Sequence, residues 1–323
     1  EYYELDPPQN PFRTAWPQPI PAIPGYSIRD YGNRVGHVRQ MQLLNKYGIR
    51  GSVSLSTALC DHHPEIIKQC RDLDWEFFSH GIYNTRYTYG MTEDQEREMI
   101  RDSIESIFKH TNQKCAGYLA PALSHSELTL DLFAEVGTEL FGNDAGIYTC
   151  DLFHDDQPTP IHLRSKKRFV SIPYSLEMND TIAYVSNKIE PRRYGQILKD
   201  NFDQLYKEGD NSGTVMCIPT HNYQISCPHR MKSYEEALEY ITGHSDVWVT
   251  TGREIAEYYL EHYYDDAVRD IAGKQESKSR GQIKTILSTH IAHSEWTIRY
   301  TNGQCLMIVH PFNGLTVKNS LYG

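Results

Sequence analysis

The sequence predicts an α/β fold in which helices pack outside a parallel sheet. Segments with strand character alternate with amphipathic segments of helical period six or seven times between residues 31 and 264. Crossover helices between parallel strands produce this pattern. No G-x-G-x-x-G or P-loop sequence follows a predicted strand, so a nucleotide-binding fold has no support. An open doubly wound sheet and a closed or nearly closed barrel both fit the alternation.

Seven strands are predicted from short runs of apolar and β-branched residues. They are IRGSVSLS (49–56), WEFFSH (75–80), KCAGYLA (114–120), TELFGND (138–144), one strand within RFVSIPYSLEMND (168–180), GTVMCIPTH (213–221) and VWVTT (247–251).

The helices are predicted from apolar residues at helical spacing, with Thr92 as an N-cap and Gly48 and Gly137 as helix ends. They cover residues 33–48, 63–74, 92–111, 126–137, 190–209, 233–244 and 252–264.

Both ends of the chain depart from this rhythm. The first thirty residues are rich in proline and tyrosine, which predicts an ordered covering loop rather than a helix or central strand. Beyond residue 265, a polar linker-like stretch (269–282) precedes a tail with β character and no matching helices. We therefore predict one domain over 1–265 and an extension of unknown structure over 266–323.

Composition limits the partners. The formal net charge of -10 argues against broad binding to nucleic acid or to anionic membranes. No apolar run approaches the roughly 20 residues of a membrane span, and no signal peptide is visible. The seven cysteines are scattered without C-x-x-C spacing, which predicts reduced thiols in a cytoplasmic protein. A small-molecule substrate is the expected partner.

Chemically capable residues gather at the predicted strand ends. His80 and His221 each close a strand, Asn143 and Asp144 close another, and Glu177, Asn179 and Asp180 follow a fourth. In parallel α/β folds this edge of the sheet holds ligands and catalytic groups. One such histidine alone is more often structural, and Asn-Asp is often a turn or a helix cap. Two histidines at the same edge, with carboxylates between them, favour a reaction centre.

Neighbouring segments have two readings each. The aromatic loop YNTRYTYG, which contains Tyr83, either lines a pocket or covers the sheet edge. His125 opens a helix after a strand edge, where it either lines the site or caps the helix. The pair His62-His63 precedes a proline at a helix start, which favours capping or a surface position.

The motifs and their order resemble the polysaccharide deacetylase superfamily, which has a NodB-like domain, and in particular its allantoinase-like and cyclic-imide-hydrolase-like branch. The resemblance extends from about Tyr31 to about Tyr259. It is carried by YGNRVGHVR, WEFFSHG, TEDQEREMI, GYLAPALS, DDQP, VSIPYSLEMND, the TH of CIPTH and VWVTTGREIAEYY.

The resemblance implies a distorted (β/α)7-type barrel whose first strand is missing from the chain. It also implies hydrolysis of a C–N bond that is not a peptide bond. The family's metal pair is His-x-x-x-His, and here His80 matches the first histidine while Asn84 stands at the second. Glu1 would occupy the second acidic position of the first motif, and His221 matches the last histidine. The arginine of the third motif is replaced by Leu119.

We therefore expect an allantoinase-like hydrolase of a small amide, cyclic ureide or imide, with His221, His80 and Glu1 as catalytic residues. Asn84, Tyr83, Pro121, Asp144, Glu177, Asn179 and Asp180 are expected to bind the substrate. Either no cofactor is required, or His80 and Glu1 hold a zinc ion. The alternatives are a metal-dependent N-deacetylase of a sugar and a non-catalytic binding protein on a degenerate barrel. Relatives of this branch suggest a homo-oligomer.

Overall fold

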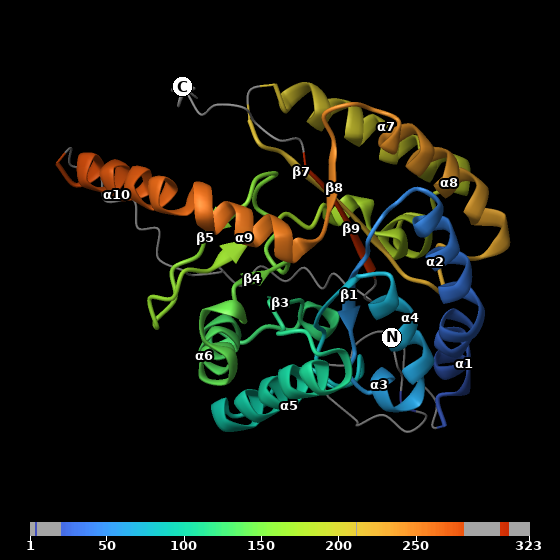
Figure 1. Ribbon diagram of the computed structural model, residues 1–323, viewed down its shortest axis with the longest axis horizontal. Helices are drawn as coiled ribbons and strands as arrows, with labels where there is room; N and C mark the ends of the chain where they lie inside the picture. Colours follow the sequence, from blue (N-terminus) through green and yellow to red (C-terminus); the bar gives the residue numbers. More distant parts are fainter. Residues whose placement is uncertain (1–3, 5–20, 211, 281–303, 310–323) are drawn as a thin grey trace.

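The computed structural model describes residue 4, residues 21–210 and 212–280, and the strand 304–309, with side chains described up to residue 272. Strands lie at the centre and helices surround them (Figure 1). The strands are β1 (Ser52–Leu55), β2 (Glu76–Ser79), β3 (Gly117–Tyr118), β4 (Tyr148–Thr149), β5 (Thr159–Pro160), β6 (Val170–Ser171), β7 (Val215–Thr220), β8 (Trp248–Thr250) and β9 (Gln304–Val309).

The helices fall between the strands, as the alternating pattern predicts. They are α1 (Ile23–Tyr31), α2 (His37–Lys46), α3 (Leu59–His62), α4 (Pro64–Asp72), α5 (Glu93–Thr111), α6 (Thr129–Phe141), α7 (Pro191–Glu208), α8 (Pro228–Thr242), α9 (Gly252–His262) and α10 (Tyr264–Arg280). Short helical turns are η1 (Gly32–Gly36), η2 (Pro121–Leu123), η3 (Gly142–Asp144), η4 (Leu176–Met178) and η5 (Ile182–Ser186).

The sheet has the order β5-β6-β4-β3-β2-β1-β9-β7, with β8 also paired to β9. Strands β1, β2, β3, β4 and β6 are mutually parallel. Both β7 and β8 run antiparallel to β9, which runs antiparallel to β1. Consequently β7 and β8 point the same way as β1, and seven strands end at one edge of the sheet. The predicted α/β fold with a parallel sheet is confirmed.

The two ends of the strand order meet through loops. No strand pairing joins β6 to β7 among the described strands. Instead, the Cys217 N–H of β7 donates to Ser175 Oγ over 3.1 Å, and the Val215 N–H donates to the Asp156 carbonyl over 2.8 Å. Loop contacts thus bring the segment after β6 against β7, in the manner of a distorted barrel.

The C-terminal region contributes β9 to the middle of the sheet. Residues 304–309 pair with residues 215–220 of β7 in continuous antiparallel register, and also with β8 and with Ser52 of β1. This C-terminal region therefore supplies β9, the strand that lies between β1 and β7.

Alternate residues of the strands face two apolar layers. Phe77 of β2 belongs to the larger core cluster, which includes apolar residues of α4, α5, α6, α7 and α8, whereas Phe78 belongs to a smaller cluster. In β7, Met216 and Cys217 divide in the same way. Burial on both faces explains why these strands read as nearly continuous apolar runs.

Three predicted segments differ in the structure. The proline-rich start contains helix α1, because Pro24 occupies the first turn, where its missing N–H costs nothing. The predicted strand 138–144 is wrong, since α6 continues to Phe141 and the strand follows later as β4. The predicted linker 269–282 is largely helix, because α10 extends to Arg280.

A buried acid lies at the opposite, amino-terminal edge of the sheet. Glu76 accepts hydrogen bonds from the hydroxyls of Tyr148 and Ser52, both at 2.8 Å, and from the Arg253 N–H at 3.0 Å. Burial nevertheless raises the pKa of Glu76 above its ordinary value. The charged form is therefore less favourable in the folded chain than in the unfolded chain.

We expect Glu76→Gln to remove a pH-dependent loss of stability. A raised pKa means that the folded state binds more protons, so wild-type stability falls as pH rises from the ordinary glutamate pKa through the folded value. Each unit of difference corresponds to about 1.4 kcal/mol. Denaturant unfolding at pH 5 and pH 8 should show a smaller decrease for Glu76→Gln, with Glu105→Gln, at an exposed position, behaving like wild type. Equal decreases in all three proteins would contradict the expectation.

The cysteines differ in part from their predicted state. Among the residues whose side chains are described, five cysteines are free: Cys60, Cys70, Cys115, Cys150 and Cys227. Cys217 is disulfide-bonded, so the prediction of reduced thiols is wrong for this residue. Burial raises the pKa of both Cys70 and Cys115 to about 12, which makes these thiols poor nucleophiles.

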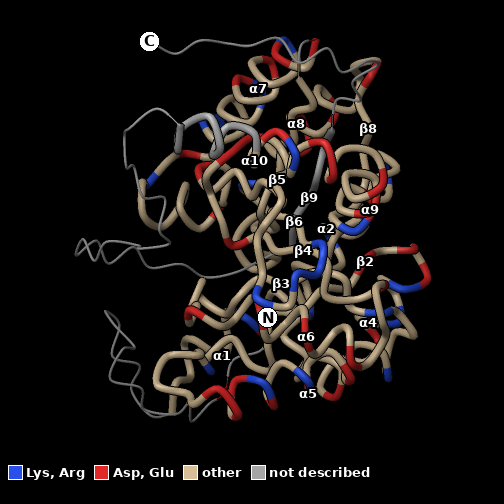
Figure 2. Tube along the Cα trace, turned by 90° about the vertical axis from the view of Figure 1, so that its left-hand side faces the viewer, with Lys and Arg blue, Asp and Glu red and all other residues tan. Residues whose placement is uncertain are grey.

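Charge is distributed without a broad basic face. Figure 2 shows acidic and basic residues interspersed along the outer helices, while the central strands are largely uncharged. None of the helices in the described chain combines the length and apolar character needed to cross a membrane.

Candidate active site at the carboxyl-terminal edge of the sheet

His221 directly follows β7 and forms a buried pair with Asp180. Its Nδ1 donates to Asp180 Oδ1 over 2.5 Å, and its backbone N–H donates to Asp180 Oδ2 over 2.9 Å. Neither side chain is exposed. The hydroxyl of Thr181 lies 3.1 Å from the same Nδ1. The carboxylate thus fixes both the ring orientation and the tautomer, so Nε2 is the nitrogen that can exchange a proton with a reactant.

Two glycines of YGNRVGHVR place a helical segment directly behind this pair. A Cβ on Gly32 would lie 2.5 Å from Asn222 Oδ1, and one on Gly36 would lie 2.1 Å from the Asn222 carbonyl oxygen. Any side chain at these positions would push the segment away from the residues that follow His221. The motif therefore serves the site by permitting close packing.

His80 ends β2 and is fully buried. Its Nδ1 donates to the Leu119 carbonyl over 2.5 Å, and its Nε2 lies 2.9 Å from Asn84 Oδ1. An amide carries a donor and an acceptor that interchange when the group turns over. Asn84 can therefore serve the ring whether its Nε2 accepts a proton or carries one.

The zinc ion that the resemblance implies finds no complete ligand set. The described residues supply the single imidazole of His80, and its Nε2 faces the Asn84 amide, a weaker zinc ligand than a second imidazole. No group of three or more His, Cys, Asp or Glu side chains suited to a metal ion occurs in the described part of the chain. Glu1 lies outside the described residues. The described residues do not fit a zinc site, and no step is derived through one.

Asp180 and Asn179 both have hydrogen-bond partners within the chain, and their contact with substrate stays a prediction. Asp180 orients His221, as described above. Asn179 donates to the Tyr174 hydroxyl over 3.0 Å and accepts the Thr181 N–H over 2.9 Å, so it fastens the turn after β6. Both residues therefore hold other parts of the site in position.

Asp144 lies away from the other predicted residues. It precedes β4, is exposed, and pairs at 2.7 Å with Lys114, which precedes β3. Both residues are therefore at the amino-terminal edge, because the segment before Asp144 is helix rather than strand. Substrate contact by Asp144 stays a prediction.

The remaining predicted residues lie around the carboxyl-terminal edge. Pro121 is buried against Gly81, whose φ of +66° and close approach exclude a side chain. Tyr83 is half-buried, with the Arg86 guanidinium 4.5 Å from its ring centroid. Glu177 is exposed on the turn after β6. Substrate contact by these three residues remains a prediction.

A second histidine–carboxylate pair follows β3 and β4. Asp151 comes two residues after β4, and its Oδ2 lies 2.8 Å from His125 Nε2. The sequence alone leaves two roles open for His125 and gives no prediction for Asp151. The available signal was an acid directly after the apolar run GIYTC, the same signal that identified His80 and His221.

A cavity of about 310 Å³ lies between the loop after β2 and α5. It is lined by Ile82, Arg86, Met91, Gln95, Glu98, Met99 and Asp102. None of these residues belongs to the two histidine–carboxylate pairs, so the cavity is separate from the candidate site.

Comparison with known proteins relates the chain to polysaccharide deacetylases. Residues 29–141 match the family model described as polysaccharide deacetylase. A peptidoglycan deacetylase of Helicobacter pylori is 25% identical over 263 residues, covering 72% of this chain and 86% of the relative.

Solved structures show the same similarity. The chain matches the Puue allantoinase with a TM-score of 0.65 and 25% identity, over 75% of this chain and 78% of that one. A probable polysaccharide deacetylase of Pseudomonas aeruginosa matches with a TM-score of 0.64 and 26% identity, over the same shares of the two chains. A putative polysaccharide deacetylase of Mycobacterium smegmatis shares the fold, with a TM-score of 0.63 and 21% identity, over 80% of this chain and 94% of that one.

Proposed function

We propose that this chain, of which residues 29–141 match the polysaccharide deacetylase family model, hydrolyses a C–N bond in a small amide, cyclic ureide or imide. The observation that carries the proposal is the buried Asp180–His221 pair at the sheet edge. A carboxylate that holds one imidazole nitrogen prepares the other for proton transfer near neutral pH. The similarity to an allantoinase structure supports a ureide or imide as the substrate class.

The proposed step is attack by water on the substrate carbonyl. His221 Nε2 takes a proton from the water, whose oxygen forms a bond to the carbonyl carbon while the π electron pair of the C=O bond moves to the carbonyl oxygen. Asp180 stabilises the resulting imidazolium without itself being protonated. His80 and Asn84 orient the water or polarise the carbonyl oxygen, and Tyr83, Pro121 and Glu177 contact the rest of the substrate. Glu1 keeps its predicted role in activating water.

Turnover of a substrate panel tests the proposal. We expect the full chain to open allantoin, hydantoin or succinimide, detected by loss of the ring absorbance or by mass spectrometry, and His221→Gln to abolish the reaction. N-acetylglucosamine and its oligomers complete the panel. Absence of turnover of every compound, together with reversible binding of one of them, would instead identify a non-catalytic binding protein.

N-deacetylation of a sugar is the second candidate, and the curated peptidoglycan deacetylase favours it. Release of acetate from the N-acetylated sugars in the panel, without ring opening of the ureides and imides, would select this function. Elemental analysis adds an independent readout: stoichiometric zinc that is lost in His80→Ala would support a metal-dependent deacetylase.

A further inference from the structure

A second imidazole–carboxylate pair, His125–Asp151, lies at the same sheet edge as the Asp180–His221 pair. Asp151 has a fully buried side chain, and His125 retains 24% of its side-chain exposure. Since Nε2 of His125 faces Asp151 at 2.8 Å, a reactant would meet the ring at Nδ1. The arrangement has the same chemical parts as the first pair, a buried acid and an imidazole beside it.

The buried carboxylate of Asp151 has hydrogen-bond donors other than His125. Both carboxylate oxygens accept the Ala120 N–H, at 3.0 and 3.1 Å, and Oδ2 also accepts the Thr149 hydroxyl at 3.1 Å. A buried carboxylate needs such donors. Because Asp151 already has them, His125 is not required merely to neutralise it.

One peptide group connects this pair to His80. The Leu119 carbonyl accepts a hydrogen bond from His80 Nδ1, and the N–H of the same peptide group, that of Ala120, donates to Asp151. Hydrogen bonds in series polarise one another. His80, Asp151 and His125 are therefore neighbours in one network.

The turn that carries His125 is held in an unusual backbone conformation. Ala122 and Leu123 both adopt positive φ, 49° and 54°, although neither is glycine. Each left-handed residue of this kind costs about 1 kcal/mol or more, and such strain concentrates at functional sites. Ser124, which follows, is fixed by the Thr88 hydroxyl donating to its carbonyl over 2.6 Å.

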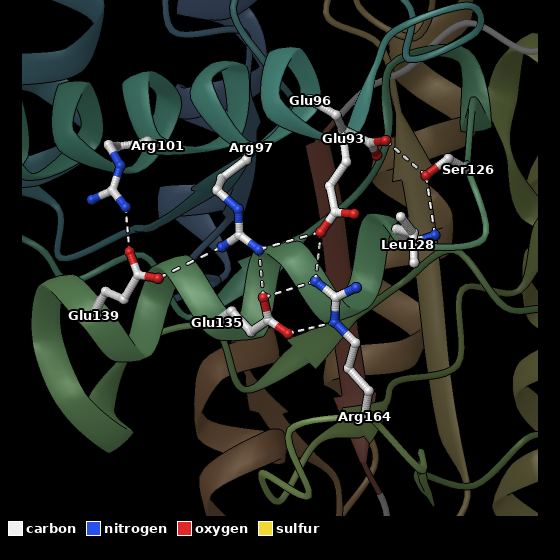
Figure 3. A network of polar contacts seen from close by, with 9 residues as sticks. All are labelled: Glu93, Glu96, Arg97, Arg101, Ser126, Leu128, Glu135, Glu139 and Arg164. Carbon is white, nitrogen blue, oxygen red and sulfur yellow. Dashed lines mark hydrogen bonds and ion pairs between the residues drawn. The ribbon is translucent and has the colours of Figure 1, made fainter.

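Helix α5 fixes the other side of the turn. Glu96 accepts the hydroxyl of Ser126 at 2.7 Å (Figure 3). It also accepts the hydroxyl of Thr129. The same helix is clamped to α6 by ion pairs in which Arg97 and Arg164 share Glu135, each at 2.6 Å. His125 thus projects from a rigid support on both sides.

The surroundings favour the protonated ring. The charged groups that act on His125 are Asp151, from the loop after β4, and Glu96, from α5. Burial works to lower the pKa of His125, but the interactions with Asp151 and Glu96 together outweigh it and raise the pKa above the ordinary value. A raised pKa widens the pH range over which the ring carries two protons and can donate one.

We propose that His125, oriented by Asp151, is the residue that donates a proton to the leaving nitrogen. This rests on the proposed hydrolysis. After water has added to the carbonyl carbon and given its proton to His221, the C–N bond breaks and its electron pair remains on nitrogen. That nitrogen takes the proton from His125 Nδ1. His221 then holds one proton more and His125 one fewer, and exchange with solvent restores both residues.

The test compares His125→Gln and Asp151→Asn with His154→Gln, at an exposed histidine that bonds Thr159 at 2.8 Å. On the panel compound that wild type turns over, we expect His125→Gln to lower kcat by about 10²–10⁴-fold and KM to change less than threefold. The fall of kcat on the alkaline side, where His125 loses its proton, should disappear. Asp151→Asn, in which Asp151 acts as a positioning residue, should move this fall to lower pH.

NMR titration of the histidine ring protons provides a readout without turnover. We expect one imidazole that titrates above the ordinary range, is absent in His125→Gln and shifts down in Asp151→Asn, while melting temperatures stay within a few degrees. A purely structural pair would leave the alkaline limb in place and kcat within threefold, and this would overturn the proposal while leaving the hydrolysis intact. A wild-type chain that turns over nothing in the panel would overturn both.

Discussion

Replacing Asp180 by asparagine is expected to lower kcat by about 10²–10⁴-fold without unfolding the chain. Asparagine can still accept the His221 N–H through its oxygen, as Asp180 Oδ2 does at 2.9 Å. Its NH2 group would then face Nδ1, which must become the acceptor, so the proton of the neutral ring moves to Nε2. A ring protonated at Nε2 cannot take a proton from water.

Three variants separate this tautomer effect from loss of the ring. His221→Gln should lose at least as much activity as Asp180→Asn, whereas Thr181→Val, which removes only the 3.1 Å hydroxyl contact, should lose less than tenfold. The measurements are kcat and KM on the panel substrate, with circular dichroism melting curves for each variant. Retention of wild-type activity in His221→Gln, or equal losses in Thr181→Val and Asp180→Asn, would contradict the role of the pair.

Removing β9 is expected to destabilise the sheet more than any single substitution considered above. A chain that ends at residue 303 loses the pairing of residues 304–309 with β7, β8 and β1. About five net hydrogen bonds at roughly 1 kcal/mol each correspond to a fall of about 10 °C in melting temperature for a chain of this size. The exposed edges should also promote association.

The matched control ends at residue 310, which keeps all of β9. Thermal unfolding and sedimentation velocity of both truncations and of the full chain distinguish the contribution of β9 from that of the residues after it. If the chain ending at 303 melts with the full chain and sediments as the same species, β9 does not contribute to the stability of the sheet.

Two strands, β2 and β7, are predicted correctly from the sequence. In β2 and β7, apolar residues run continuously because both faces are buried, and His80 and His221 follow directly as predicted. The failure at 138–144 has a specific cause. Gly137 resembles a helix end but lies inside α6, where a Cβ would come within 2.9 Å of the Gly146 backbone. Close packing between segments, rather than helix termination, explains this glycine.

The sequence predicts at which edge of the sheet the residues of the candidate site lie, but not which residues they contact. The order of residues places Asp180 at the correct edge, yet only the fold shows that it faces His221, because the two are 41 positions apart in the chain. Asp151 was hidden for a related reason: β4 consists of two residues, too short for a period-two pattern to reveal it.

The position of β9 also has a consequence for how the chain folds. Strands β1 and β7 do not pair directly with each other, because the six residues of β9 lie between them. In the sequence, β9 is separated from β1 by about 250 positions. A contact of such long sequence separation forms late and slowly. During synthesis, the earlier part of the sheet emerges first, and its two inner edges can be joined only after residue 309 has left the ribosome. We therefore expect the two inner edges of the sheet to be joined only after β9 has been synthesised, with the helical segments already in place.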